Sequence, residues 1–295
     1  MTDAAPDGDA PSTPWSPPLP PGEAIELPGR GTTFVRTMPG PRDAPTVLLL
    51  HGWTATMDIN WFRCFEALGQ HYRVVALDHR GHGRGIRSRR RFRLADCADD
   101  AMALCDRLGL RRVIPVGYSM GGPVAQLCWK QHHDRVRGLV LCATASYFSG
   151  NRSERLSFLG LAGLAAVARV TTPQARARIT EQLYLSRKST QWGDWAISEA
   201  SRHDWRAVAE AGSALGTYNA RDWITTVDVP TSVVITMQDN VVPVRRQERL
   251  FEAIPDAEAY RVDGDHGVVA APDERFNVVL LRAIRSVVER SSVVP

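Results

Sequence analysis

Short apolar runs recur along most of the chain, and polar or amphipathic stretches separate them. Six runs have the length and composition of strands, at 46–50, 73–77, 113–116, 136–142, 231–236 and 257–262. A run that is apolar on both faces is typical of a strand covered by helices on both sides of a sheet. Helical stretches lie between these runs, so the pattern predicts an α/β fold with a mostly parallel, doubly wound sheet.

The stretches between the expected strands carry helical periodicity. Between 94 and 108, apolar side chains recur at i, i+4, i+7, i+11 and i+14, which is one face of a helix that ends at Gly109. Further helices are expected at about 61–68, 123–132 and 272–289. Ahead of the first buried strand, two short runs, 25–27 and 34–36, flank a Gly-Arg-Gly turn and predict a β-hairpin.

From about 145 to 225 no strand-like run occurs. Helical stretches dominate there, at 154–168, 173–184 and 195–212. We interpret this segment as a helical cap inserted into a single α/β domain spanning 23–295. Aromatic side chains are concentrated in and beside it, and we expect them either to wall an apolar pocket or to pack the cap helices together. The candidates are Trp192, Trp195, Trp205, Tyr147 and Phe148, with Trp53 and Met120 beneath them.

The composition limits which function classes and which cellular compartment are expected. Residues 1–22 carry seven prolines and no apolar pattern, which predicts a disordered tail that buries little surface. The net charge of +4 is too small to indicate nucleic-acid binding, and neither of the two lysines follows a glycine, which excludes a P-loop. Five cysteines without a C-x-x-C pair indicate reduced thiols in a cytoplasmic protein rather than a disulfide or zinc framework. No secretory signal or membrane span is expected, and the oligomeric state stays open.

The motif Gly117-Tyr118-Ser119-Met120-Gly121 follows an expected strand and precedes an expected helix. In that setting, Gly-x-Ser-x-Gly forms a sharp turn called the nucleophile elbow. The turn exposes the hydroxyl of Ser119 and places the N–H of Met120 at the positive end of the helix, where it can bind a developing oxyanion.

A serine nucleophile needs a base and a carboxylate that orients the base. The order serine, acid, histidine is usual for a nucleophile elbow, and His266 is the histidine that lies beyond residue 204. Asp239 is favoured as the acid because it follows the strand-like run 231–236 by three residues, with Asp265 and Asp228 as alternatives. The N–H of Trp53, after the first buried strand, is expected to be the second oxyanion donor.

Other polar clusters have simpler interpretations. His51, His79 and His82 lack the spacing of a metal site and are expected to be hydrogen-bonded structural residues. The arginine-rich run 84–93 favours a solvated loop over a site for an anionic substrate or membrane surface. The apolar stretch 156–170 favours a buried helix over a rim that meets lipid.

Together these motifs resemble the α/β-hydrolase fold superfamily. His51-Gly52-Trp53, the elbow, Gln238-Asp239 and Asp265-His266 all lie where that family places them. The resemblance implies a Ser119–His266–Asp239 triad, an oxyanion hole at Trp53 and Met120, and no metal or organic cofactor. Because the nucleophile is serine, it disfavours haloalkane dehalogenase and epoxide hydrolase chemistry, which uses aspartate.

We therefore expect a serine hydrolase that cleaves a carboxylic ester of a small or medium apolar substrate through an acyl-enzyme. The same triad serves lactones, thioesters, C–C bonds next to a ketone and perhydrolysis. A non-catalytic ligand-binding protein on the same fold is an alternative of a different class.

Overall fold

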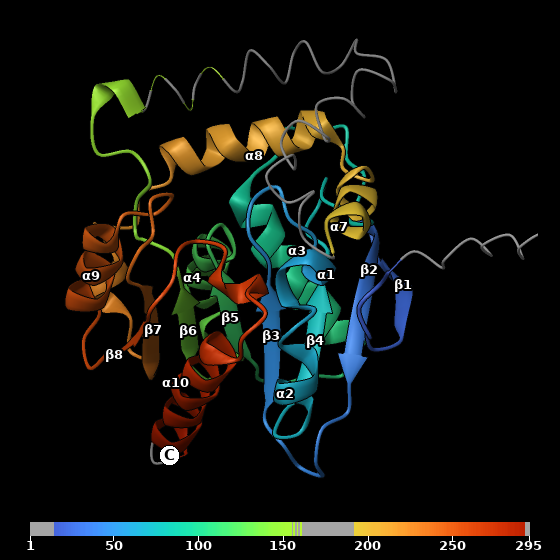
Figure 1. Cartoon of the computed structure of the whole chain (residues 1–295), viewed down its shortest axis with the longest axis horizontal. Coiled ribbons are helices and arrows are strands. Elements are labelled where there is room, and N and C mark those ends of the chain that lie inside the picture. Colours follow the sequence, from blue (N-terminus) through green and yellow to red (C-terminus); the bar gives the residue numbers. More distant parts are fainter. Residues whose placement is uncertain (1–14, 155, 157, 159, 161–191, 293–295) are drawn as a thin grey trace, which may run out of the picture.

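The computed structural model describes residues 15–154, 156, 158, 160 and 192–292 (Figure 1). Its centre is an eight-stranded sheet with the order β1-β2-β4-β3-β5-β6-β7-β8, in which β1, β2 and β4 pair antiparallel and all other neighbours pair parallel. The strands are β1 Gly22–Leu27, β2 Gly31–Met38, β3 Thr46–Leu50, β4 Arg73–Leu77, β5 Ile114–Tyr118, β6 Leu139–Cys142, β7 Thr231–Thr236 and β8 Glu258–Val262. The predicted α/β class, with its mostly parallel sheet and its hairpin, is confirmed.

The register of the strands fixes the position of the loops that carry the predicted site residues. Leu50 at the end of β3 pairs with Leu77 at the end of β4 and with Gly117 near the end of β5. On the other side, Thr236 at the end of β7 pairs with Val262 at the end of β8. Because parallel strands run in the same direction, the loops that follow them emerge at one edge of the sheet.

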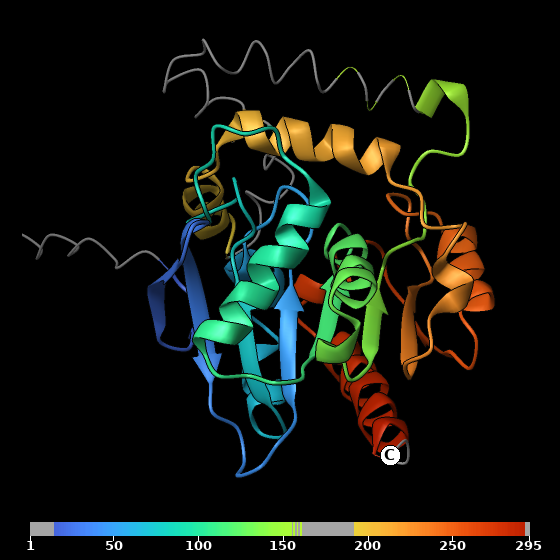
Figure 2. The same ribbon diagram turned by 180° about the vertical axis from the view of Figure 1, so that it is seen from behind.

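Helices cover both faces of the sheet (Figures 1 and 2). One face packs against α3 Leu94–Arg107, α4 Gly121–Gln131 and α9 Val244–Ala253. The other packs against α1 Met57–Trp61, α2 Phe65–Gly69 and α10 Arg275–Ser291. Within the described ranges, no helix is both long and apolar enough to cross a membrane.

Two expected helices differ from the structure, and one observed helix was not expected. The stretch 61–68 forms two short helices, and the first begins earlier because the hydroxyl of Thr56 accepts the N–H of Ile59 as a cap. The stretch 195–212 is also divided, into α7 Gly193–Ala200 and α8 Trp205–Thr217, because Asp204 caps the start of α8. Helix α9 was not predicted, since its side chains are mostly charged or exposed.

The described part of the expected cap is helical. Helix α8 lies across the edge of the sheet from which the functional loops emerge, with α7 beside it (Figure 1). An isolated bridge between Tyr147 and Asn219 joins the two ends of the insertion. Helical residues at 154, 156, 158 and 160 fall in the expected helix 154–168, which already begins at 152 in the structure, and Leu156 is 58% exposed. The expected helix 173–184 and most of the apolar stretch 156–170 lie outside the described residues.

The arginine-rich run 84–93 is a loop with buried anchors. Ile86 and Phe92 point into the protein and are almost fully buried, whereas the arginines at 89, 90, 91 and 93 are exposed. The backbone N–H of Phe92 donates to Glu210 of α8. The run 84–93 is therefore an exposed loop that is hydrogen-bonded to α8.

The end of the proline-rich segment packs on the domain, although the whole of 1–22 was expected to be a disordered tail. Trp15 meets Phe62 and Trp195 edge to face, with ring centroids 6.3 and 6.2 Å away. Leu19 packs against the core on the same side of the sheet as α1. The aromatic pocket combines residues from α7 and from the α1–α2 turn, so it is not visible in the sequence around Trp15.

Trp15→Ala should destabilise the protein, because it removes two aromatic contacts that each contribute about 0.5–1.5 kcal/mol beyond area burial. For a chain of this size, a loss of about 1–2 kcal/mol corresponds to a fall in Tm of roughly 3–6 °C. Thermal unfolding followed by circular dichroism would measure it, with the exposed neighbour Ser16→Ala as the control. An unchanged Tm for Trp15→Ala would contradict docking of this segment in solution.

Candidate active site

The nucleophile elbow connects β5 to α4. Ser119 has a φ of +53°, a left-handed conformation that non-glycine residues rarely adopt. Its neighbours are crowded: a Cβ added to Gly121 would lie 2.0 Å from the carbonyl oxygen of Leu50, and one added to Gly117 would lie 2.2 Å from the carbonyl oxygen of Gly121. The N–H of Ser119 donates to the carbonyl of Cys142 at 2.9 Å, which ties the turn to β6.

Ser119, His266 and Asp239 form a continuous hydrogen-bonded chain. His266 Nε2 lies 3.0 Å from Ser119 Oγ, and His266 Nδ1 lies 2.7 Å from Asp239 Oδ2. The carboxylate of Asp239 can only accept, so Nδ1 carries the hydrogen and Nε2 is left to accept the proton of the serine hydroxyl. The hydroxyl of Tyr118 also donates to the backbone carbonyl of His266 at 2.9 Å.

Asp239 stays charged although it is only 4% exposed. Burial acts to raise the pKa of this carboxyl, but hydrogen bonds from His266, Thr236 and the backbone of Val242 outweigh it, so the pKa is lowered. Oδ1 accepts the N–H groups of Val241 and Val242, each at 2.8 Å. Oδ2 accepts the hydroxyl of Thr236 at 2.7 Å as well as the imidazole. These bonds fix both oxygens of the carboxylate.

Gln247 supports this carboxylate, and the sequence interpretation missed it together with α9. Its buried Nε2 donates to the carbonyl of Val242 at 2.8 Å and lies 3.2 Å from Asp239 Oδ2. Its Oε1 accepts the backbone N–H of Thr236 at 3.0 Å. Gln247 and Leu250 are the two buried residues of α9. Their i, i+3 spacing was the available signal, and it is too short to identify a helix.

The alternative acids make other contacts. Asp265 accepts the N–H of Gly267 at 2.8 Å within its own loop. Asp228 bonds His133 and the indole of Trp129. Among these three aspartates, the structure therefore brings only Asp239 against His266.

The two expected oxyanion donors lie at the same edge of the sheet. No described residue accepts the backbone N–H of Trp53 or of Met120. The backbone of Gly52 is held at both of its polar groups, because Asn60 Oδ1 accepts its N–H at 2.9 Å and its carbonyl oxygen lies 2.8 Å from His51 Nδ1. The indole of Trp53 donates to the carbonyl of Val208 in α8 at 2.7 Å.

A cavity of about 130 Å³ lies beside Ser119 and His266. Its walls are mainly apolar and include Trp53, Ile59 and, from the cap, Trp192. The other aromatic residues expected in the wall do not line it.

Those residues pack elsewhere. Trp195 packs on Phe62, and Trp205 packs on His203. The ring of Tyr147 lies beneath the guanidinium of Arg221. Phe148 packs against the core of the domain.

Residues 45–269 match the family model of the alpha/beta hydrolase fold. The matched range spans most of the chain and includes Ser119, Asp239 and His266. The chain belongs to the α/β hydrolase fold family. Ser119, His266 and Asp239 therefore lie in a protein whose relatives include proteins named as hydrolases.

This α/β hydrolase is similar to several known proteins. It is 35% identical over 116 residues to Epoxide hydrolase B from Mycobacterium tuberculosis, a match that covers 38% of this chain and 32% of that enzyme. It is 37% identical over 103 residues to the Bifunctional esterase/perhydrolase DCH from Acinetobacter calcoaceticus, covering 35% and 37%. The structure of a thermophilic esterase from Thermogutta terrifontis superposes with a TM-score of 0.75 at 22% identity, covering 90% and 99%.

Four histidines, His51, His79, His82 and His203, cluster beside the loop that follows β3 in this α/β hydrolase. Their rings contact one another, with centroids 4.3 Å apart for His51 and His79 and 5.4 Å apart for His82 and His203. Burial lowers the pKa of each imidazole, to about 3 for His79 and about 4 for His203, so the rings are neutral. Within the part of the chain that the structure describes, no cluster of ligand-type side chains could hold a metal ion.

His203 connects the cap to two loops of the domain. Its Nδ1 accepts the backbone N–H of Gly83 at 2.8 Å, so Nε2 carries the hydrogen and donates to the carbonyl of Thr54 at 3.1 Å. A proton on Nδ1 would abolish the first of these bonds. The neutral ring is therefore part of the folded structure.

His203→Gln should weaken the pH dependence of stability. Because the folded-state pKa of about 4 lies below the ordinary value of 6.5, the unfolded chain binds a proton that the folded chain does not. His203 then costs the wild type about 1.4 kcal/mol of stability per unit as pH falls from 6.5 towards 4, and nothing above 6.5. The variant should lack this contribution and keep those of His51, His79 and His82, so its slope should be smaller.

Urea unfolding at pH 7, 6 and 5 would measure the slopes of wild type and variant, with exposed His71→Gln as the matched control. Equal slopes for wild type and His203→Gln would show that this imidazole is not held neutral by the fold.

Proposed function

We propose that this protein is a serine hydrolase that cleaves carboxylic esters with a small or medium apolar acyl group. The observation that carries the proposal is the chain of two hydrogen bonds from Ser119 Oγ through His266 to Asp239, at the edge of an apolar cavity. Two backbone N–H groups without described acceptors lie beside it, as acyl transfer requires.

Acylation follows from this arrangement. Ser119 Oγ attacks the ester carbonyl while His266 Nε2 takes the hydroxyl proton. The carbonyl electron pair moves onto oxygen, and the N–H groups of Trp53 and Met120 donate to it. Asp239 stabilises the imidazolium that has formed. When the carbonyl re-forms, the C–O bond to the alcohol breaks, and His266 gives its proton to the departing oxygen.

Deacylation repeats these steps with water as the nucleophile. His266 Nε2 takes a proton from water, and the resulting hydroxide attacks the acyl carbon. The second tetrahedral intermediate uses the same two N–H groups. Collapse breaks the bond to Ser119 Oγ, which recovers its proton from His266, and the carboxylic acid leaves.

The nucleophile separates this proposal from other activities in the family. A relative at 35% identity over 38% of the chain is named as an epoxide hydrolase, but an elbow aspartate would be needed for the chemistry expected of such enzymes, and this elbow carries Ser119. The partial match to an enzyme named as an esterase and perhydrolase supports the proposal of ester hydrolysis. The same triad can act on lactones, thioesters and C–C bonds next to a ketone, and it can carry out perhydrolysis. The assays should therefore include these substrates and this reaction.

The described cavity sets the expected size of the acyl group. A cavity of about 130 Å³ is close to the roughly 150 Å³ that suffices for a benzene molecule in an engineered apolar cavity. Each methylene buried there contributes about 0.8 kcal/mol until the space is full. A charged acyl group would lose its hydration without a matching partner.

We expect kcat/KM for phenyl esters to rise from acetate to butanoate and to fall again by dodecanoate. Ser119→Ala should abolish turnover without unfolding the protein, and the exposed serine variant Ser198→Ala should retain it. Steady-state kinetics with phenol release, lactones in parallel and circular dichroism of each variant would test this. Undiminished turnover by folded Ser119→Ala would refute the mechanism, whereas a flat profile to dodecanoate would refute only the bounded pocket.

Asp239→Asn should lower kcat by about 10⁴, because an amide at this position favours the wrong tautomer of His266. Asp265→Asn is the matched control, since its carboxylate contacts the N–H of Gly267 and not the imidazole. Turnover numbers for both variants on one ester would decide the assignment. If Asp265→Asn were the crippling change, the acid would be misassigned.

A further inference from the structure

Residues 15–21 are attached to the domain at several points, and we call them the N-terminal strap. Four of its seven residues are prolines, which restrict the backbone. Pro17 is buried, and Leu19 packs against the core on the same side of the sheet as α1. The carbonyl of Pro20 accepts a hydrogen bond from the guanidinium of Arg36 in β2. Because its backbone has little freedom, the strap holds Trp15 in a defined place.

The ring of Trp15 packs on the cap helix α7. It meets Trp195 of that helix and Phe62, which follows α1, edge to face at 6.2 and 6.3 Å. Phe62 also contacts Trp195 at 5.3 Å and Trp192 at 5.8 Å. The four rings form one cluster, and Trp192 is the member that lines the cavity beside Ser119. Aromatic contacts therefore join the strap to the wall of the candidate active site.

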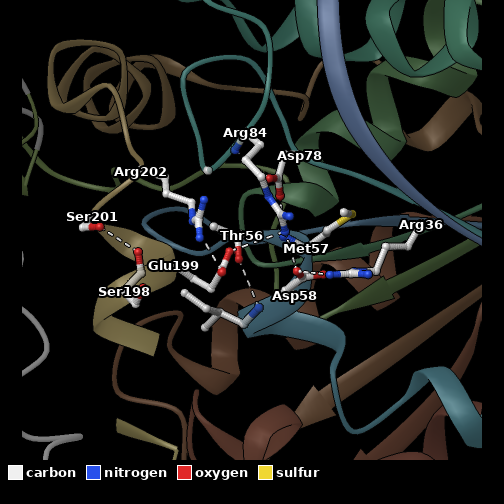
Figure 3. Close-up of polar contacts among 12 residues, drawn as sticks. Arg36, Thr56, Met57, Asp58, Asp78, Arg84, Ser198, Glu199, Ser201 and Arg202 are labelled. Atoms are coloured by element: carbon white, nitrogen blue, oxygen red, sulfur yellow. Dashed lines mark hydrogen bonds and ion pairs between the residues drawn. The ribbon is translucent and has the colours of Figure 1, made fainter. Parts of the chain in front are cut away.

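A set of ion pairs joins the strap to the same helix. Arg36, which binds the carbonyl of Pro20, also pairs with both carboxylate oxygens of Asp58 in α1, at 2.6 and 2.8 Å. Arg84 donates to Asp58 at 2.6 Å and lies 3.5 Å from Glu199 of α7 (Figure 3). Both carboxylates are buried, so solvent and salt screen these pairs little. The strap, α1 and α7 are thus connected by charged groups as well as by rings.

The position of Trp192 depends on such contacts because α7 is short. The helix has eight residues, Gly193–Ala200, and an isolated helix of that length is marginal in water. Its buried Ala196 and Ala200 pack with Ile59 of α1, which lines the cavity itself. Trp192 is the N-cap residue of α7. The contacts that hold α7 therefore also fix the place of the Trp192 ring in the cavity wall.

We propose that the N-terminal strap determines the acyl chain length that the cavity accepts, with Trp15 as a positioning residue that acts through Trp192. Among the described residues, Trp192 is the contribution of the cap to the cavity wall. When Trp15 is lost, α7 loses its ring contact with the strap, and the Trp192 ring can give way to a longer chain. This inference rests on the proposed ester hydrolysis and assigns its size limit to a segment remote from the triad.

The ratio of kcat/KM for phenyl octanoate to kcat/KM for phenyl butanoate tests this. Both esters are assayed on the same preparation, so a loss of folded enzyme cancels in the ratio. In Trp15→Ala the ratio should rise about fourfold or more, since each further methylene that is buried contributes about fourfold. Trp192→Ala should raise the ratio at least as much. The double variant should not exceed Trp192→Ala, because Trp15 acts through that ring.

Trp223→Ala is the matched control. Its ring stacks on Trp129 at 6.1 Å and does not line the described cavity, so this variant loses an aromatic contact but should keep the wild-type ratio. Trp15→Leu keeps an apolar side chain and should lose less stability than Trp15→Ala. It should give a smaller rise of the ratio in the same direction. Circular dichroism would establish that each variant is folded at the assay temperature.

A ratio that is unchanged or lower in folded Trp15→Ala and Trp15→Leu would overturn the inference, even if the Tm fell, because that result describes a purely structural anchor. Independent effects of Trp15→Ala and Trp192→Ala, multiplying in the double variant, would overturn it as well. Failure of the proposed function would look different, since wild type would then cleave neither ester, and that result would refute ester hydrolysis and this inference together.

Discussion

The hydrogen bond between His266 Nδ1 and Asp239 Oδ2 is the contact on which the site depends. It sets the tautomer that leaves Nε2 facing Ser119, and it needs a charged carboxylate in a buried position. That charge is tolerated because donors from β7, from the following loop and from Gln247 of α9 surround it. These polar groups under the site are therefore arranged around one carboxylate.

The loop after β3, which carries the proposed oxyanion donor Trp53, is held by the cap in a comparable way. The indole of Trp53 donates to Val208 in α8, and His203, between α7 and α8, donates to the carbonyl of Thr54. Cap and loop thus share hydrogen bonds as well as apolar contacts, and the position of the Trp53 N–H is linked to the position of α8. Under the proposed mechanism, a change in the cap would therefore also move one of the two oxyanion donors.

The features that depend on neighbouring residues in the sequence could be predicted from it. Buried strands are visible as apolar runs, and the elbow has its own sequence motif. The expected chain order selects His266, because it is the histidine beyond residue 204. The break before Trp205 had a visible signal in Asp204, a good cap residue. Gln247 had only the short i, i+3 spacing with Leu250, and Trp15 had no signal, because its partner Trp195 is distant in the chain. The same holds for Trp195 and Trp205, whose rings pack away from the cavity.

Covalent labelling tests the central claim, that Ser119 is an activated nucleophile, without knowledge of the natural substrate. The folded wild type would be treated with a fluorophosphonate, and the modified peptide identified by mass spectrometry. We expect one phosphonyl group per chain, on Ser119, and much slower labelling after Asp239→Asn because the imidazole is then misoriented. No labelling of folded wild type, or labelling at another residue, would contradict the account.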